Sequence, residues 1–344
     1  MRIGVTFDLR ADYLARGFGE EETAEFDSEV TIQGICGALA DLGHAPVRVG
    51  NIHQLVARLV AGERYDCVFN ICEGLNGVAR EAQVPALLDA FQIPYVFSDA
   101  LTLSLSLDKA MAKRVIRDAG VPTPDFAVIE TPDDIRGLRL GFPVFAKPVA
   151  EGSGKGVSAT SRATNSAELQ EVARDLLSRF RQPVLVESFL SGREFTVGIT
   201  GTGAEAESLG VMEVIFTEYA HAHGYGYENK EHFEGKMLYR LVHDQEALKA
   251  EAVALSAWRV LRCRDGGRVD VRSDAHARPH FLEVNPLAGL NPERSDLVYL
   301  TRFAGIAYRE LIGRIMASFL RRYPELAASA DAAAFRIRQL SAAE

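Results

Sequence analysis

The first hundred residues alternate short apolar segments with amphipathic stretches, and this alternation constrains the possible folds more than any other feature of the sequence. Between the segments, apolar residues recur at helical spacing; one predicted helical face holds Val30, Ile32, Ile35, Leu39 and Leu42. Strands that are separated by helices favour a parallel sheet. The pattern predicts strands at Arg2–Phe7, Pro46–Val49, Asp66–Ile71 and Ile93–Phe97, and helices at Ser28–Leu42, Ile52–Val60 and Gln83–Phe91.

One segment interrupts this alternation. Arg10–Asp27 is long and acidic and contains Gly17 and Gly19, so we expect a surface loop. A loop after the first strand would lie at the C-terminal edge of the sheet, where open α/β sheets bind ligands. A solvated loop without a role is the alternative.

The rest of the chain divides into two further regions and a tail. The first is predicted to hold helices at Ser106–Ala119, after Thr131 and at Ala167–Arg179, and strands at Phe126–Ile129, Pro143–Lys147 and Val184–Ser188. The second is predicted to hold antiparallel strands at Glu194–Thr200 and Leu209–Phe216, a helix at Gln245–Leu261, a hairpin of Arg268–Arg272 with Phe281–Val284, and a final helix ending at Arg322. The expected domains are therefore 1–101, 102–188 and 189–323, followed by an Ala-rich tail at 324–344.

Composition narrows the functional class. The chain has 344 residues, which suggests two or three domains, and its formal net charge is −9. Proteins that bind nucleic acid usually carry a basic surface, so we expect no nucleic-acid partner. No apolar run approaches the ~20 residues of a membrane-spanning helix, and the N-terminus does not read as a signal peptide. We therefore expect a cytoplasmic protein, without a membrane partner, whose four cysteines are free thiols.

A glycine-rich segment, Glu151–Val157, follows the strand that ends at Lys147. Glycine lacks a Cβ, so the backbone N–H groups of such a segment can close on phosphate oxygens. The segment is not a P-loop, because Gly rather than Ser or Thr follows Lys155. A flexible hairpin tip is the alternative. Lys147 and Lys109 could each hold a phosphate or point into solvent.

Three oxygen-bearing side chains come together on the predicted hairpin. Asp270 lies in an apolar strand, while Glu283 and Asn285 share one face of the returning strand. Buried carboxylates need cations, and oxygen ligands without His or Cys suit Mg²⁺. A structural salt bridge with Arg268, which shares the face of Asp270, is the alternative.

An extended segment, Val186–Leu190, precedes Glu194. The backbone of such a segment could contact the edge of a base, and the carboxylate could bind ribose hydroxyls. Without the other motifs, this would be an ordinary strand end.

The order and spacing of these segments resemble the ATP-grasp enzymes, and within them the D-alanine–D-alanine ligases. The resemblance runs from about Asp27 to Leu320 and rests on LSLDKAMAK, FPVFAKPVAEGSGKGV, VLVESFLSGREFTVGI, YGYENK, GGRVDV and FLEVNPLAG. It implies an α/β, ATP-grasp fold in which an N-terminal parallel α/β domain precedes two α+β domains that clasp ATP. It also implies two Mg²⁺ ions, or Mn²⁺ in their place, an acylphosphate intermediate, small-molecule amino-acid substrates and a homodimer.

The resemblance assigns roles to residues at matching positions. Those implied to bind ATP are Lys109, Lys147, Gly152, Ser153, Gly154, Glu187, Ser188, Phe189, Leu190, Glu194, Lys230 and Leu282. The implied metal ligands are Asp270, Glu283 and Asn285. The implied catalytic residues are Arg268, Ser153, Lys230 and Gly289, with Lys230 on a lid at Tyr219–Met237.

The positions that face the amino acids in the family differ in this chain. The expected contacts are Asp27, Glu73, Glu231, Arg268, Gly289 and Ser295. Glu73 replaces a histidine of the family, and Glu231 replaces a tyrosine. We therefore expect an ADP-forming carboxylate–amine ligase that acts on a non-standard amino-acid pair. Housekeeping D-alanine–D-alanine synthesis and a phosphotransferase on the same fold are the alternatives.

Overall fold

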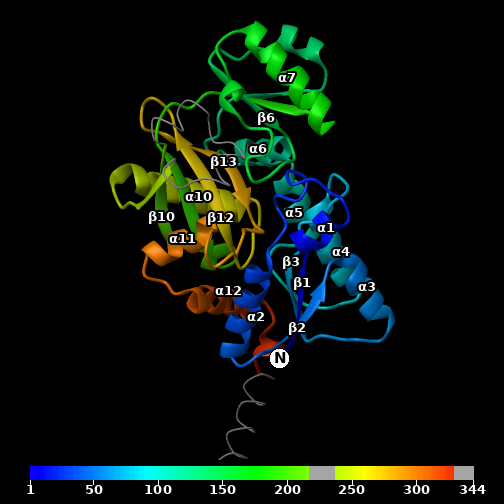
Figure 1. Ribbon diagram of the computed structural model, residues 1–344. Helices are drawn as coiled ribbons and strands as arrows, with labels where there is room; N and C mark the ends of the chain where they lie inside the picture. Colours follow the sequence, from blue (N-terminus) through cyan, green and yellow to red (C-terminus); the bar gives the residue numbers. More distant parts are fainter. Residues whose placement is uncertain (217–236, 329–344) are drawn as a thin grey trace, which may run out of the picture.

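The computed structural model describes residues 1–216 and 237–328 of the chain. Within these ranges the chain forms three sheets of four, five and four strands (Figure 1). Figure 1 shows the N-terminal sheet at the lower right, the C-terminal sheet at the left, and β6 and α7 at the top. In the part of the chain that the structure describes, no helix combines the length and the apolar composition that a membrane crossing requires.

The N-terminal sheet is parallel, as the alternation of strands and helices predicted, and its strand order is β2-β1-β3-β4. The middle strand β3 is buried along its whole length, because helices cover both faces of such a sheet. Its strands are β1 (Arg2–Phe7), β2 (Ala45–Gly50), β3 (Cys67–Ile71) and β4 (Tyr95–Val96). Its helices are α1 (Arg10–Ala15), α2 (Glu29–Asp41), α3 (Ile52–Val60), a 3₁₀ turn (Arg80–Ala82) and α4 (Gln83–Ala90).

The prediction of a loop over Arg10–Asp27 was wrong for its first six residues, which form α1. Tyr13 on this helix is buried and donates a hydrogen bond to Asp8 Oδ1 at 2.5 Å. Its ring packs at a tilt against that of Phe26, with the ring centroids 4.4 Å apart. The many acidic residues indicated a solvated loop and gave no sign of these aromatic contacts. The contacts hold the segment against the end of β1.

The central sheet is antiparallel, with the order β5-β8-β6-β7. The apolar face of α7 packs against it, and Leu169, Ala173 and Leu176 are buried there. Its strands are β5 (Phe126–Ile129), β6 (Val144–Pro148), β7 (Arg162–Ala163) and β8 (Val184–Ser188). The remaining elements are α7 (Ser166–Phe180) and 3₁₀ turns at Pro132–Gly137 and Ala159–Ser161.

The helix predicted at Ser106–Ala119 is two helices, α5 (Ala100–Leu107) and α6 (Lys109–Asp118). Asp108 has an extended backbone between them, and its side chain accepts a hydrogen bond from the N–H of Met111. An N-cap of this kind satisfies a free backbone donor and starts a new helix. The break makes Lys109 the first residue of α6.

The C-terminal sheet is antiparallel, with the order β11-β10-β9-β12-β13. Trp258 on α10 is fully buried against its apolar face. The predicted hairpin is confirmed, and Asp270 on β12 lies opposite Glu283 on β13. The elements are β9 (Glu194–Thr200), a 3₁₀ turn (Gly203–Glu205), β10 (Glu207–Phe216), β11 (Met237–Leu241), α10 (Gln245–Val260), β12 (Gly266–Ser273) and β13 (Pro279–Asn285).

The last predicted helix is also divided, into α11 (Asp296–Phe303) and α12 (Tyr308–Arg322). Gly305 between them has a φ of 77°, which an L side chain adopts only with strain. The bend turns α12 toward the N-terminal sheet.

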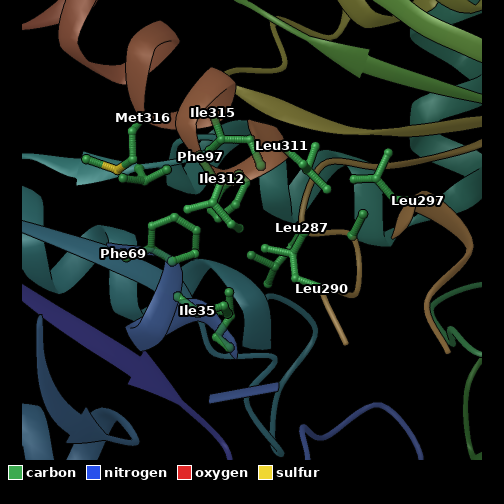
Figure 2. Close-up of a cluster of buried hydrophobic side chains, with 14 of the residues drawn as sticks. Ile35, Phe69, Phe97, Leu287, Leu290, Leu297, Leu311, Ile312, Ile315 and Met316 are labelled. Atoms are coloured by element: carbon green, nitrogen blue, oxygen red, sulfur yellow. The ribbon is translucent and has the colours of Figure 1, made fainter. Parts of the chain in front are cut away.

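The N-terminal and C-terminal regions share one hydrophobic core. Figure 2 shows Phe69 and Phe97 of the N-terminal region beside Ile312 and Ile315 of α12. Leu287, from the loop after β13, belongs to the same cluster. This core holds the loop after β13 next to the ends of the N-terminal strands.

Candidate active site

Most of the predicted site residues that the structure describes line one of two cavities. The first, of about 410 Å³, is lined by predicted residues Lys109, Lys147, Gly152, Gly154, Glu187, Ser188, Phe189, Leu190, Glu194, Asp270, Leu282 and Glu283. The second, of about 210 Å³, is lined by predicted residues Asp27, Ser153, Arg268, Gly289 and Ser295. Neither cavity is lined by Glu73 or Asn285, and Lys230 and Glu231 lie outside the described residues.

Two lysines from different elements converge in the first cavity. The backbone N–H of Lys109 donates to Val149 O, and its Nζ donates to Glu151 O at 2.5 Å. Lys147, on β6, places its Nζ 3.1 Å from Glu187 Oε2. Both ammonium groups also approach Glu283 Oε2, at 3.6 Å and 3.8 Å. Burial lowers the pKa of Lys147, but the carboxylates of Glu187 and Glu283 outweigh it and raise that pKa overall, so the lysine is a cation.

The far end of the first cavity is built around Phe189. The guanidinium groups of Arg162 and Arg272 lie 4.6 Å and 5.4 Å from its ring centre. Arg272 also places Nη1 3.0 Å from Glu194 Oε2, because the two residues are opposite one another on β12 and β9. Neither arginine was expected from the sequence, although the pairing of β9 with β12 places Arg272 beside Glu194.

The carboxylates of the hairpin fit a hard divalent cation. Asp270 accepts a hydrogen bond from Thr196 Oγ1 at 2.9 Å and another from Asn285 Nδ2 at 3.2 Å. Among the described residues no group of three or more His, Cys, Asp or Glu side chains could hold a metal, but Mg²⁺ needs only one or two carboxylates beside substrate phosphates. The alternative ion pair is present too, since Arg268 Nη1 contacts Asp270 Oδ2.

Glu25 connects the N-terminal segment to the glycine-rich loop, a role that the sequence analysis did not assign. Its Oε1 accepts from the N–H of Gly152 at 2.5 Å, and its Oε2 lies 3.1 Å from both Lys155 Nζ and Arg80 Nη2. Burial raises the pKa of Glu25, but Arg80 and Lys155 lower it further than burial raises it. Because Arg80 also donates to Ala150 O, the network ties both ends of the loop to the N-terminal region.

The second cavity has Asp27 in its wall. Burial is the main cause that raises the pKa of Asp27 to about 7; Asp8 raises it further, and a hydrogen bond with Thr31 lowers it. Glu29, the neighbouring candidate, is instead held at the surface by Arg48 through contacts of 2.6 Å and 2.7 Å. Of Asp27 and Glu29, it is therefore Asp27 that lines this cavity.

Comparison with known proteins identifies the family. Residues 115–317 match the family model described as D-ala D-ala ligase C-terminus. The chain belongs to the D-alanine–D-alanine ligase family. Similar D-alanine–D-alanine ligases come from Aquifex aeolicus, 31% identical over 288 residues that cover 83% of this chain and 93% of the relative, and from Bordetella petrii, 34% identical over 257 residues that cover 73% and 75%. An uncharacterized protein of Sinorhizobium fredii is 32% identical over 275 residues, covering 74% and 75%.

A solved structure confirms the fold expected for this family. The D-alanine–D-alanine ligase of Bacillus anthracis complexed with ATP aligns with a TM-score of 0.70 and 21% identity, covering 94% of this chain and 99% of that one. The predicted ATP-grasp architecture, with a parallel N-terminal sheet and antiparallel sheets beyond it, is therefore confirmed.

Within this ligase-family framework, the contact of Glu73 with substrate stays a prediction. Glu73 lines neither cavity. Burial raises its pKa well above the usual value, and the nearby carboxylates of Glu81, Glu25 and Asp27 raise it further. Arg80 lowers the pKa of Glu73 in part, but the ion pair of Arg80 is with Glu25. Glu73 therefore lies near enough to these carboxylates to interact with them electrostatically, although it does not line the cavity that Asp27 and Glu25 line.

The second cavity contains residues that the sequence analysis missed. Asp296 Oδ2 lies 3.9 Å from Arg268 Nη1, and Asp296 Oδ1 accepts a hydrogen bond from Tyr239 at 3.4 Å. Ser295 Oγ accepts from the N–H of Asn291 at 2.8 Å. The cavity is also lined by Arg10, Glu25, Arg294 and Tyr299. Acids and arginines are thus present together, which suits a zwitterionic ligand.

Proposed function

We propose that the protein is an ATP-dependent, ADP-forming carboxylate–amine ligase. The observation that carries this proposal is that neighbouring residues of one strand and of one loop line different cavities. Asp270 lines the first and Arg268 lines the second, two residues apart on one strand. Gly152 and Gly154 line the first cavity, whereas Ser153 between them, with a φ of 52°, lines the second. A nucleotide in one cavity would therefore present its terminal phosphate to an acid in the other.

The first cavity suits ATP. Lys109 and Lys147 would hold the inner phosphates, and the backbone of the glycine-rich loop would close on them. The segment from Glu187 to Leu190, with Leu282, would line the adenine slot, and Glu194 would bind ribose hydroxyls. Asp270, Glu283 and Asn285 would hold Mg²⁺, which neutralises charge on the transferring phosphate.

Arg268 and Gly289 would act on the reacting acyl group. The carboxylate of one substrate attacks the γ-phosphorus, the bond to the bridging oxygen breaks, and ADP leaves. The amine of the second substrate then attacks the acylphosphate carbon, losing a proton as inorganic phosphate departs. Arg268 and the N–H of Gly289 would stabilise the tetrahedral oxyanion between these steps. Exclusion of water matters because water would hydrolyse the acylphosphate.

The proposed substrates are an amino-acid pair other than two D-alanines. Asp27, Glu25 and Asp296 bring three carboxyl groups to the second cavity. A small apolar pair would offer little to offset their desolvation. A partner with a cationic or hydroxylated side chain would supply donors to Asp27 and Asp296, so we expect such a partner to be preferred.

ADP release, measured with amino acids added singly and in pairs, tests the reaction class. A ligase requires two substrates for full turnover and forms a joined product. Full ADP release with one acceptor and a stable phosphorylated product would instead show a phosphotransferase. Binding of ATP without turnover in any mixture would contradict the proposal altogether.

A screen of amino-acid pairs tests the selectivity. We expect two D-alanines to be a poor pair, and we expect Asp27→Asn to weaken the preference for a cationic or hydroxylated partner. Glu29→Gln is the matched control, because Glu29 is paired with Arg48 at the surface. Efficient D-alanyl-D-alanine synthesis, with kcat/KM of about 10⁴ M⁻¹s⁻¹ or more, would refute the selectivity argument and restore the housekeeping function.

A further inference from the structure

A third lysine, Lys113, lies beneath the proposed nucleotide cavity without lining it. It follows Lys109 by one turn of α6, and its side chain is 0% exposed. Its Nζ donates to Thr123 Oγ1 at 2.9 Å and to Phe281 O at 3.1 Å. Burial lowers the pKa of Lys113 to about 8, a value at which it is still mostly protonated at neutral pH.

The ion pair that Lys113 makes is with a wall residue of the cavity. Lys113 Nζ lies 2.6 Å from Glu187 Oε1, while Glu187 Oε2 lies 3.1 Å from Lys147 Nζ. The side chain of Glu187 is only 4% exposed, so its charge is shared between two ammonium groups and is barely screened by water. One carboxylate therefore faces two cations, and only Lys147 of the two lines the cavity.

This arrangement determines how much positive charge Lys147 presents to a phosphate. If Lys113 were absent, Glu187 and Lys147 would form a neutral buried pair. A phosphate would then have to compete with Glu187 for the ammonium group. With Lys113 present, Glu187 is already compensated, and Lys147 keeps a net attraction for an anion in the cavity.

We propose that Lys113 is a positioning residue for the nucleotide: by neutralising Glu187 it leaves the charge of Lys147 available to the phosphates. This inference rests on the proposed function, because it assumes that the first cavity binds ATP. It assigns Lys113 an action through Glu187 and Lys147, without contact with the nucleotide. A merely structural lysine would instead join α6 to β13 through Thr123 and Phe281.

A double-mutant cycle on ATP affinity separates the two roles. Dissociation constants for Mg-ATP and melting temperatures are measured for wild type, Lys113→Met, Glu187→Gln and the double variant. We expect Lys113→Met alone to weaken ATP binding at least tenfold. In the Glu187→Gln background the same change should cost less than about threefold, because no carboxylate remains to be neutralised. Lys249→Met, at an exposed position of α10 that lines neither cavity, is the matched control and should change neither quantity.

Equal losses of affinity in both backgrounds, or unchanged affinity in Lys113→Met, would overturn the inference. If Lys113→Met does not fold, Lys113→Arg decides, since it keeps the charge and alters the packing. ATP affinity within about threefold of wild type together with a lowered Tm supports the electrostatic role, and a tenfold loss contradicts it. If the wild-type protein does not bind ATP in this titration, the proposed function itself is contradicted. That result is distinct from a loss of affinity in the Lys113 variants alone.

Discussion

Glu283 faces Asp270 across the hairpin and approaches Lys109 and Lys147, so its charge lies where the proposed metal and the proposed nucleotide would meet. We predict that Glu283→Gln abolishes turnover and leaves the fold intact, because the amide removes the charge that a divalent cation requires. The loss in kcat should be at least about a hundredfold, since even outer-shell partners of a bound metal are worth 10- to 100-fold. ADP production and circular dichroism are the measurements; activity near wild type with Mg²⁺ would remove Glu283 from the metal site.

Asp27 should make stability depend on pH. Its pKa is about 7 in the folded protein and near 3.8 in an unfolded chain. Between these values the folded state keeps a proton that the unfolded state has lost, so stability falls as the pH rises from 4 to 7 and is constant above that range. Asp27→Asn should gain up to about 4 kcal/mol relative to wild type across this window. Urea unfolding from pH 4 to pH 8 measures this difference in the free energy of unfolding, with Asp41→Asn at an exposed position as the control. If the free energies of wild type and Asp27→Asn change in parallel with pH, the raised pKa of Asp27 is contradicted.

At the scale of elements, the glycine-rich loop depends on close packing at its end. Gly156 has a φ of 74°, and a Cβ there would lie 2.6 Å from Pro148 Cγ and 2.9 Å from Phe180 Cε2. We predict that Gly156→Ala lowers the free energy of unfolding by about 2 kcal/mol or more, because it adds overpacking to backbone strain. Gly37→Ala on α2, where a Cβ meets nothing within 4 Å, should raise stability by about 0.5–1 kcal/mol. Urea denaturation compares the two, and equal effects would show that the loop end is not tightly packed.

At the scale of the whole molecule, Asp265 joins the N-terminal and C-terminal regions. Its carboxylate is fully buried, accepts from the N–H of Phe97 at 2.8 Å, and pairs with Arg322 at 2.5 Å. Arg322 also donates to Tyr95 O at 3.0 Å, so the end of α12 is attached to β4.

Removal of Arg322 would leave a buried, uncompensated charge. We predict that Arg322→Met costs about 3–5 kcal/mol in the free energy of unfolding. The neighbouring Arg321→Met should cost less than about 1 kcal/mol, because Arg321 and its partner Glu205 are 51% and 64% exposed. Chemical denaturation of both variants tests the difference, and similar losses would show that the junction does not depend on this ion pair.

The sequence by itself determined most of the order of the elements and the parallel N-terminal sheet, because these features depend on local information. The residues that line the first cavity were named chiefly by the resemblance to a known family. Hydrophobic periodicity defines strands and helices, and the short hairpin pairs Asp270 with Glu283 because β12 and β13 are consecutive. Lys147 could be placed at the end of an apolar strand for the same reason, whereas the role of Glu187 was implied only by the family resemblance.

Only the tertiary structure decided which side chains from distant parts of the chain meet. Glu25 contacts Gly152 across 127 residues of sequence, and Arg80 reaches Ala150 across 70. Asp27 lines the second cavity, whereas Glu29 and Glu73 do not. Such contacts depend on how α1 folds onto β1 and how α12 packs on the N-terminal sheet. Periodicity along the chain reports which face of an element is buried, but the partner of that face is chosen by the packing of the whole molecule.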